Sequence, residues 1–433
     1  MFSRGTMKKV FSGKKFRLGP VHQRRSIIEA ESPGSEDFLH SGRDEEMLSL
    51  SEAMVEQAVG YMAVPLGLAG PLLIDGRQYM IPLATEEPSV IAACSFAGGL
   101  TARHGGISTS ASDPVMAAQI FIEDKGGLGS AGIEIIQAAQ ESIKDKLMPM
   151  LLSMENRGGG WRGMETDWME SERIFFVTLK IDVRDAMGAN LLNSAAERVR
   201  PLLEQLTGGQ VLMAILSNRC ENRIARAAFS LPVKSLLRPG SGGRETAERI
   251  VKAARIARKN SDRAVTHNKG IMNGISALAL AACNDTRAIE AAAHAYACRD
   301  GQCRGLSEYW LEGNVLHGSL EMPLPFAVTG GAVDFHPTSR WALALLDNPD
   351  ARGLSRIAAA VGLMQNLAAL RALVCEGIQE GHLSLHARRL SFSAGARGED
   401  IGAYTQVIRR EAIRSRSAAM NRFKRWKKEH APL

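Results

Sequence analysis

Between Pro114 and Asn218 the chain alternates short apolar runs with amphipathic stretches, and this alternation constrains the fold more than any other feature of the sequence. The runs AAQIFIE, IFFVTLKIDV and QVLMAIL are typical of buried strands. Residues Ile133 to Leu152 and Leu192 to Leu203 carry apolar side chains at helical spacing. Because the pattern differs on both sides of this region, we expect an α+β unit inserted between two parts of a larger domain.

The larger domain is expected to comprise residues 1–113 and 219–376. Within it, Leu72 to Ala84 consists of two apolar runs joined at Asp75-Gly76, a pair that tolerates positive φ and therefore predicts a hairpin. The acidic pair Glu86-Glu87 follows, at a predicted strand-to-helix junction. Residues 219–376 are alanine-rich, and we expect them to be helical. Their clearest helix runs from Arg352 to Glu376, with apolar residues along one face.

After this helix, Gly377 and Gly381 interrupt the helical pattern, and residues 377–433 are expected to form a basic, mobile C-terminal segment. At 433 residues and 45% hydrophobic composition, the chain is long enough for two or three domains with large cores. It has no run of about 18 or more apolar residues, which disfavours a membrane-spanning helix.

The six cysteines are scattered, without the spacing of a disulfide framework, so a reducing cytoplasmic location fits best. Cys298 and Cys303 are the closest pair, but no second ligand cluster accompanies them. A zinc site is therefore disfavoured, and we expect no metal.

The formal net charge is +7. A basic balance of this kind fits nucleic acid, a membrane surface or a polyanionic small molecule as a partner. Much of the excess is terminal, and its simplest interpretation is solvated helix faces. The basic N-terminus also resembles an organelle transit peptide, although it lacks a clear amphipathic run.

A nucleotide site is indicated where a predicted strand passes through Asp185-Ala186-Met187-Gly188-Ala189-Asn190 into a helix. Free amides at a helix N-terminus attract phosphate, and Gly188 lets the backbone approach a ligand closely. The segment has no GxGxxG pattern, which disfavours a Rossmann fold. A simple structural turn is the alternative.

The segment Thr266-His267-Asn268-Lys269-Gly270-Ile271-Met272-Asn273-Gly274 is denser in polar groups than a structural loop needs. One interpretation is a solvated loop. The other is that the Lys269 ammonium is aimed at a developing oxyanion, an arrangement whose removal typically costs about 10²- to 10³-fold in rate.

Three further positions have both a structural and a chemical interpretation. Asp285 could cap the following helix. Glu87 could favour a helix N-terminus through its dipole, or act as an acid beside a second carboxylate. His382 and His386 lie four residues apart but lack the glutamate of an HExxH zinc motif. On a glycine-flanked segment, His382 is suited to donate a proton near neutral pH.

Together these segments resemble the 3-hydroxy-3-methylglutaryl-coenzyme A (HMG-CoA) reductase family, and in particular its soluble, bacterial-type second class (class II). The resemblance runs from about Glu56 to Arg397. It rests on the ordered motifs PLATEEPSVIAA, IDVRDAMGAN, GGQVLMAILSN, THNKGIMNGI, AAHAYACRDG, SLEMPLP and GHLSLHAR. Because several motifs occur in order over most of the chain, they favour the chemical interpretation at each position.

The resemblance implies three sets of site residues. The catalytic set is Glu87, Lys269, Asp285 and His382. The substrate-binding set is Arg17, Ser89, Arg263, Asn273, Gln365 and Asn366. The cofactor-binding set is Asp185, Met187, Gly188, Asn190 and Asn218.

The architecture that the resemblance implies belongs to the α+β class. It has a large helical substrate-binding domain, an inserted ferredoxin-like dinucleotide-binding domain at residues 114–218 and a small C-terminal flap at 377–433 that carries the histidine. The implied ligands are HMG-CoA, mevalonate and CoA. Active sites are shared across a homodimer or a larger homo-oligomer, and neither nucleic acid nor a membrane is an expected partner.

The implied reaction interconverts (S)-HMG-CoA and (R)-mevalonate plus CoA by two successive hydride transfers with NADPH or NADH, through a hemithioacetal and mevaldehyde. Lys269 stabilises the oxyanion, and His382 protonates the departing CoA thiolate. Glu87, kept partly protonated by Asp285 and linked to Lys269, supplies the proton when mevaldehyde is reduced.

Several positions depart from the family pattern. Glu56-Gln57 stands where the family has Glu-Asn, and the following segment GYMAVPLGLAGPL is closer to the membrane-anchored class. His382 is followed by Leu383, where methionine is commoner. These departures leave the catalytic set intact. Gly163 stands where NAD-preferring relatives carry an acid for the ribose hydroxyls, and its position beside Arg162 favours NADPH or dual use over strict NADH use.

Two other functions are compatible with parts of the sequence. One is the reduction of a different branched acyl-CoA. The other is a basic RNA- or membrane-binding protein, whose binding would be salt-sensitive and would depend on the residues after Arg397.

Overall fold

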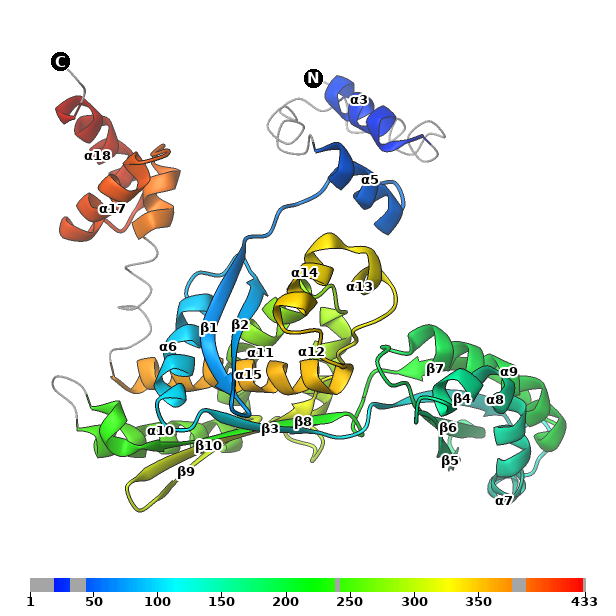
Figure 1. Cartoon of the computed structure of the whole chain (residues 1–433). Helices are drawn as coiled ribbons and strands as arrows, with labels where there is room; N and C mark the ends of the chain where they lie inside the picture. Colours follow the sequence, from blue (N-terminus) through cyan, green and yellow to red (C-terminus); the bar gives the residue numbers. More distant parts are fainter. Residues whose placement is uncertain (1–18, 32–43, 238–241, 376–386, 431–433) are drawn as a thin grey trace. The chain divides into compact units, whose positions relative to one another are not determined.

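The computed structural model describes residues 19–31, 44–237, 242–375 and 387–430, and it contains two sheets (Figure 1). The six-stranded sheet has the order β2-β1-β3-β8-β10-β9. Its strands are β1 (Leu66–Ile74), β2 (Arg77–Ala84), β3 (Ile107–Ala111), β8 (Ile224–Pro232), β9 (Ser307–Glu312) and β10 (Val315–Pro323). The four-stranded sheet has the order β5-β6-β4-β7. Its strands are β4 (Val115–Glu123), β5 (Gly160–Met169), β6 (Ile174–Asp182) and β7 (Gln210–Ser217).

The hairpin predicted at Asp75-Gly76 is confirmed. Asp75 has a φ of 49° and Gly76 a φ of 81°, and Ile74 pairs with Arg77 across the turn. Two consecutive residues with positive φ match the right-handed twist of the flanking strands. The chain leaves β2 through Glu86-Glu87 and enters α6 (Val90–Ala102), which is the predicted strand-to-helix junction.

The inserted α+β unit is also observed. The chain leaves the six-stranded sheet at the end of β3 and returns to it in β8, where Ala111 pairs with Ala225. The intervening order is β4, α7 (Ala131–Ala138), α8 (Gln140–Glu155), β5, β6, α9 (Ala189–Thr207) and β7. A βαββαβ order in a sheet arranged β5-β6-β4-β7 is the ferredoxin-like arrangement. Its core contains residues from β4, β6 and the helices α7, α8 and α9.

Three details of the sequence prediction are wrong. The helix expected over Ile133 to Leu152 is two helices, α7 and α8, separated at Ala139. Strand β5 was not predicted, because its sequence GWRGMETDWM has no apolar alternation. Residues 219–376 are not wholly helical, since they contain β8, β9 and β10. The β8 sequence IARAAFSLP contains three alanines, and alanine has a low strand propensity.

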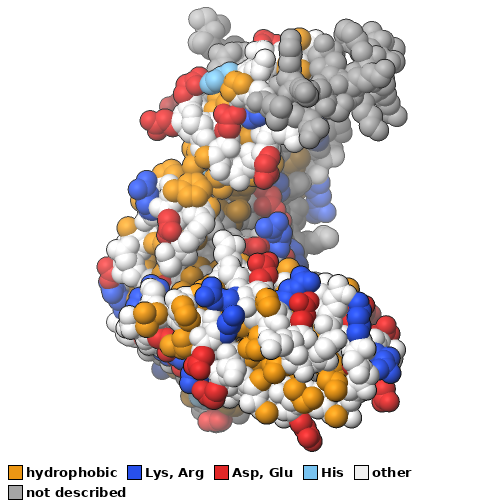
Figure 2. All heavy atoms as spheres, turned by 90° about the vertical axis from the view of Figure 1, so that its right-hand side faces the viewer, with side chains coloured by type: hydrophobic (Ala, Val, Ile, Leu, Met, Phe, Trp, Pro, Cys, Tyr) orange, Lys and Arg blue, Asp and Glu red, His pale blue; other side chains and the backbone are white. Residues whose placement is uncertain are grey.

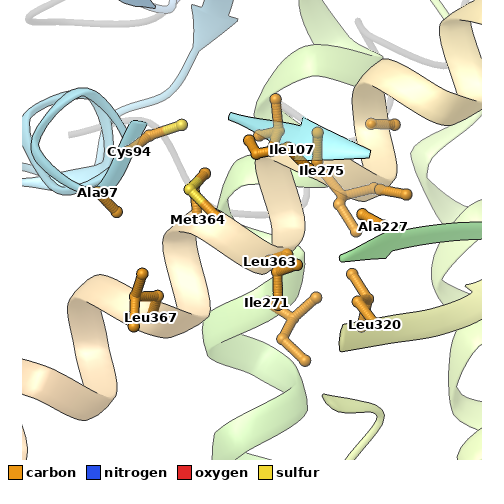
Figure 3. Close-up of a cluster of buried hydrophobic side chains, with 14 of the residues drawn as sticks. Cys94, Ala97, Ile107, Ala227, Ile271, Ile275, Leu320, Leu363, Met364 and Leu367 are labelled. Carbon is orange, nitrogen blue, oxygen red and sulfur yellow. The ribbon is translucent and has the colours of Figure 1, made fainter. Parts of the chain in front are cut away.

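The remaining helices of this region are α10 (Gly243–Lys259), α11 (Ser261–Ala281), α12 (Thr286–Ala297), α13 (Ala332–Phe335), α14 (Pro337–Leu345) and α15 (Ala351–Cys375), with a 3₁₀ turn η1 at Val233–Leu236. Helix α15 packs against α6, α11 and the strands β3, β8 and β10. Figure 3 shows Leu363, Met364 and Leu367 of α15 between side chains of these neighbours.

Helix α15 was expected to be apolar along one face, but nearly all residues from Ala351 to Leu370 are buried. A helix that is apolar all round is a core helix or a membrane span. Among the described helices, α15 is the one with the length and composition to cross a membrane, and 72% of its most apolar window is buried in the protein. That burial is the property of a core helix.

Two terminal parts are described by themselves. Near the N-terminus, Arg24 of α3 (Val21–Glu31) is buried and pairs with Glu52 of α5 (Glu45–Met54) at 2.8 Å. In the C-terminal part, α17 (Asp400–Arg410) and α18 (Arg416–Glu429) share an apolar cluster that includes Tyr404, Phe423 and Trp426. This part therefore has a core of its own. The predicted domain limits and the mobility of the C-terminal segment stay predictions.

Candidate active site

A cleft of about 450 Å³ lies between the start of α6, the first half of α11 and the second half of α15. Seven of the residues singled out by the family resemblance line it: Glu87, Ser89, Arg263, Lys269, Asn273, Gln365 and Asn366. The fold therefore brings together two residues of the implied catalytic set and five of the implied substrate-binding set. Their roles stay predictions.

The start of α6 positions Glu87 and Ser89. The Glu87 carboxylate is exposed, and its backbone N–H donates to Thr85 Oγ1 at 3.1 Å. Ser89 precedes the helix with a φ of 81°, in the left-handed region that a serine rarely adopts. Such a conformation costs about 1–3 kcal/mol and is found most often where a site requires it.

Helix α11 carries the segment Thr266 to Gly274, so the solvated-loop interpretation of this segment is wrong. Helical spacing places Arg263, Thr266, Gly270 and Asn273 along one side of the helix, and all four line the cleft. Lys269 also lines the cleft, and its side chain is exposed. An exposed ammonium at the edge of a cleft is free to contact a ligand oxygen.

The motif also contains two buried polar residues, His267 and Asn268, for which the sequence analysis predicted no role. The Asn268 amide donates to Arg304 O at 2.8 Å and accepts from Leu306 N at 2.9 Å. It thereby attaches the segment before β9 to α11. The density of polar residues in the motif was the signal that could have identified them.

Asp285 is the N-cap of α12, as its structural interpretation predicted. Its carboxylate accepts from the backbone N–H groups of Arg287 and Ala288 at 3.0 and 3.2 Å and pairs with the Arg287 side chain at 3.2 Å. It does not line the cleft formed by the described residues of this chain. His382 and Arg17 lie outside the described residues.

The predicted cofactor loop joins β6 to α9. Gly188 is the N-cap of α9 with a φ of 89°, and a Cβ atom there would lie 2.5 Å from Val183 Cγ1. Only glycine fits this position. No side chain caps the helix among the described residues, so the first amides of α9 are left for another acceptor.

The other residues of the implied cofactor set are placed as follows. Asp185 links the loop to the large core, because its side chain accepts from Ala351 N at 3.0 Å and its carbonyl from Val328 N at 2.9 Å. Met187 is half-buried in the loop. Asn190 is exposed in the first turn of α9, and Asn218 is exposed directly after β7.

Two charged residues that support this loop were not predicted. Arg223 is buried and donates to the carbonyls of Phe326 and Ala186. Burial lowers the pKa of Arg223 to about 10, which leaves it charged at neutral pH. Asp182 is fully buried and accepts from Arg162 Nη2 at 3.1 Å and Arg184 N at 3.0 Å. An isolated arginine or aspartate beside a strand gave no sequence signal for these contacts.

The described residues contain no group of three or more His, Cys, Asp or Glu side chains placed to hold a metal ion. Cys298 and Cys303 are both free thiols.

Comparison with known proteins identifies the family. Residues 20–387 match the family model of hydroxymethylglutaryl-coenzyme A reductase. The chain is 40% identical over 370 residues to 3-hydroxy-3-methylglutaryl-coenzyme A reductase of Archaeoglobus fulgidus, covering 84% of this chain and 83% of the relative. It is 35% identical over 378 residues to a probable enzyme of the same name from Borreliella burgdorferi, covering 87% and 86%.

A solved structure agrees with these matches. The class II 3-hydroxy-3-methylglutaryl-CoA reductase from Streptococcus pneumoniae, bound to NADPH in open conformations, superposes with a TM-score of 0.74. The two sequences are 34% identical, and the match covers 94% of this chain and 99% of that one. The chain therefore belongs to the hydroxymethylglutaryl-coenzyme A reductase family.

Proposed function

We propose that this chain reduces HMG-CoA to mevalonate and CoA in the cleft between α6, α11 and α15. The observation that carries the proposal is the convergence of Glu87, Lys269 and five polar residues on one cleft from three separate segments. An ammonium and a carboxyl group in one cleft can stabilise an oxyanion and donate a proton, which are the two tasks of carbonyl reduction.

The loop before α9 fits a dinucleotide. The free amides at the start of α9 attract phosphate, and the absence of a side chain at Gly188 lets the loop pack closely against Val183. A bound NADPH or NADH would supply hydride to the substrate. Asp185, Met187, Gly188, Asn190 and Asn218 would hold it.

In this mechanism Lys269 stabilises the negative oxygen that forms when the thioester carbonyl is reduced to the hemithioacetal. His382 protonates the departing CoA thiolate. Glu87 donates the proton to the oxygen of mevaldehyde in the second reduction, and Asp285 would be the second carboxyl group that assists it. Each group thus acts on an atom whose charge changes during the reaction.

For the cofactor, NADPH or dual use is favoured over strict use of NADH. The Streptococcus pneumoniae relative was solved with NADPH. In this chain Gly163 offers no carboxylate for the ribose hydroxyls, and the neighbouring Arg162 is a cation beside the buried Asp182. We expect no metal requirement, so an excess of EDTA should leave the rate unchanged.

The test is oxidation of NADPH and of NADH by the purified protein, driven either by HMG-CoA or by acetoacetyl-CoA. We expect turnover with HMG-CoA and little with acetoacetyl-CoA, which lacks the branched hydroxy acid that the polar lining would bind. Equal rates with the two thioesters would favour a broader acyl-CoA reductase. No oxidation with either cofactor would contradict the proposal.

The substitution Gly188→Ala is expected to weaken NADPH binding at least about tenfold, because the new Cβ would push the loop away from Val183. The matched control is Gly208→Ala. Gly208 also has a positive φ, 61°, but a Cβ there meets only Gly126 Cα at 4.0 Å. Both variants bear the strain of about 1–2 kcal/mol. Titration of NADPH should separate them, and equal affinities would show that the loop does not hold the cofactor.

We also propose a homodimer, or a larger homo-oligomer, with shared active sites. Large apolar side chains are exposed beside the cleft: Phe96 at 46%, Val265 at 53% and Leu373 at 40%. A second subunit would bury them, and Asp285 would complete the site only in the assembled protein. An apolar rim of this kind is typical of a subunit interface.

Subunit mixing tests the shared site. Random reassociation of Lys269→Ala and Gly188→Ala protomers would place an intact lysine opposite an intact loop in one site of each mixed dimer. With NADPH held below its dissociation constant, we expect about a quarter of the wild-type activity, against about a tenth or less for Gly188→Ala alone and almost none for Lys269→Ala alone. If mixed dimers form but activity does not recover, the lysine and the cofactor loop of one site belong to the same subunit.

Nucleic acid and membranes are not proposed as partners, and a cytoplasmic location remains our expectation. Figure 2 views the end of the molecule that carries the four-stranded sheet, and on this face basic, acidic and hydrophobic side chains are mixed. A nucleic-acid interface would require a continuous basic surface.

A further inference from the structure

We propose that His267 is a positioning residue: together with Ser307 and Tyr309 it fixes the side-chain amide of Asn366 as a hydrogen-bond donor to an oxygen of the bound acyl group. The inference rests on the proposed function, because it takes the cleft as the thioester site. It gives a role to three residues, His267, Ser307 and Tyr309, to which the family resemblance assigned none.

The evidence is a buried polar cluster that joins α11, β9 and α15 directly beneath the cleft. His267 Nε2 lies 2.7 Å from Ser307 Oγ, which lies 2.8 Å from Asn366 Oδ1. Tyr309 Oη lies 2.9 Å from the same Asn366 oxygen, and Asn366 Nδ2 lies 3.2 Å from His267 Nε2. All four residues are buried, and both His267 and Asn366 line the cleft.

With the Asn366 oxygen facing Ser307 and Tyr309, the number of available protons sets the direction of these hydrogen bonds. Tyr309 donates to Asn366 Oδ1, and Ser307 has a single proton, which it gives to the same oxygen. Ser307 Oγ must then accept at its 2.7 Å contact, so His267 Nε2 carries the proton. The 3.2 Å contact between His267 and Asn366 is the longest of the four and is left without a shared proton.

The other ring nitrogen of His267 supports this tautomer. Nδ1 is buried and has no hydrogen-bond partner within the described part of the chain. A buried N–H without an acceptor is rarer and more costly than a bare lone pair, so the proton belongs on Nε2. Burial, with a smaller effect from Arg263, lowers the pKa of His267 to about 4. The imidazole is therefore neutral throughout the physiological range.

The backbone around Ser307 is held in the same way. Asn268, the next residue on α11, binds Arg304 O and Leu306 N immediately before Ser307. At Gly305, a Cβ atom would lie 3.3 Å from His267 Cδ2, so the glycine permits the close approach of this segment to the imidazole. The position of Ser307 is thus determined by two neighbouring side chains of one helix turn.

These contacts set the orientation of the Asn366 side-chain amide in the cleft. With Oδ1 accepting from two donors, the Asn366 nitrogen is turned away from both hydroxyls and is left to donate to an acceptor in the cleft. The neighbouring Gln365 has the opposite character, because its buried Oε1 lacks a partner among the described residues. The cluster of His267, Ser307 and Tyr309 therefore sets Asn366 as the amide that donates to the substrate.

A kinetic double-mutant cycle tests the proposal, with His267→Asn, His267→Gln and Asn366→Ala. A glutamine can place an N–H near the position of the imidazole Nε2–H, whereas an asparagine is too short. We expect His267→Asn to lower kcat/KM for HMG-CoA by about 3- to 10-fold and to leave the KM for NADPH unchanged, and His267→Gln to restore most of the loss. In the Asn366→Ala background, His267→Asn should cause no further loss.

The proposal would be overturned if the losses in kcat/KM caused by His267→Asn and Asn366→Ala multiplied in the double variant. It would also be overturned if His267→Gln were as impaired as His267→Asn. Tyr309→Phe, which removes the second donor to Asn366 and little volume, keeps the test valid if the histidine variants fold poorly. It too should lower kcat/KM for HMG-CoA only when Asn366 is present. Absence of activity in the wild-type protein would instead reject the proposed function.

Discussion

Lys269→Ala is expected to lower kcat for HMG-CoA reduction by about 10²- to 10³-fold, because it removes the one cation assigned to the developing oxyanion. Lys269 lines the cleft with an exposed side chain, so its removal leaves no cavity and no buried partner. Exposed substitutions of this kind usually change stability by less than about 0.5 kcal/mol. The melting temperature should therefore stay close to that of the wild type.

The control is Lys252→Ala, an exposed lysine on the neighbouring helix α10 that does not line the cleft. It should retain wild-type kcat. Steady-state rates and thermal melts of both variants are the measurements. A Lys269→Ala variant with nearly normal turnover would remove this lysine from its role.

Glu87→Gln is expected to lower kcat by about 10²- to 10⁴-fold, the range for loss of a positioned proton donor. The amide retains the shape of the carboxyl group and some of its hydrogen bonding but cannot supply the proton. Since the proton is needed in the second reduction, turnover of mevaldehyde with NADPH should fall at least as far as turnover of HMG-CoA.

The adjacent residue provides a matched control. Glu86 and Glu87 are both exposed at the same strand-to-helix junction, but only Glu87 lines the cleft. Glu86→Gln should therefore remain near wild-type activity in both assays. Equal losses in the two variants would indicate a general effect of charge at this junction rather than proton transfer.

Parts of the fold were predictable because local chemistry determines them. The pair Asp75-Gly76 tolerates positive φ, and both residues adopt it in the hairpin. Strands β4 and β6 are buried at alternate positions, which their apolar pattern indicated. Strand β8 could not be found this way, since its alanines become strand residues only by pairing with β3 and β10.

The candidate site was likewise predictable only in part. The family motifs selected seven residues that line one cleft, although the segments that carry them are distant in sequence. The region was expected to be helical in general, but a loop was one interpretation of the segment around Lys269, because Gly270 and Gly274 resemble loop residues. Gly274 instead permits close packing, since a Cβ there would lie 2.8 Å from Val361 Cγ1 of α15. Contacts such as those of His267 with Ser307 depend on tertiary packing and have no local signal.

If one cleft carries a thioester through two successive reductions, the stoichiometry of the reaction shows it most directly. Purified protein supplied with limiting HMG-CoA and excess NADPH should oxidise about two NADPH for each mevalonate formed and release about one CoA thiol. Oxidation of about one NADPH with accumulation of mevaldehyde, or no thiol release, would contradict the account.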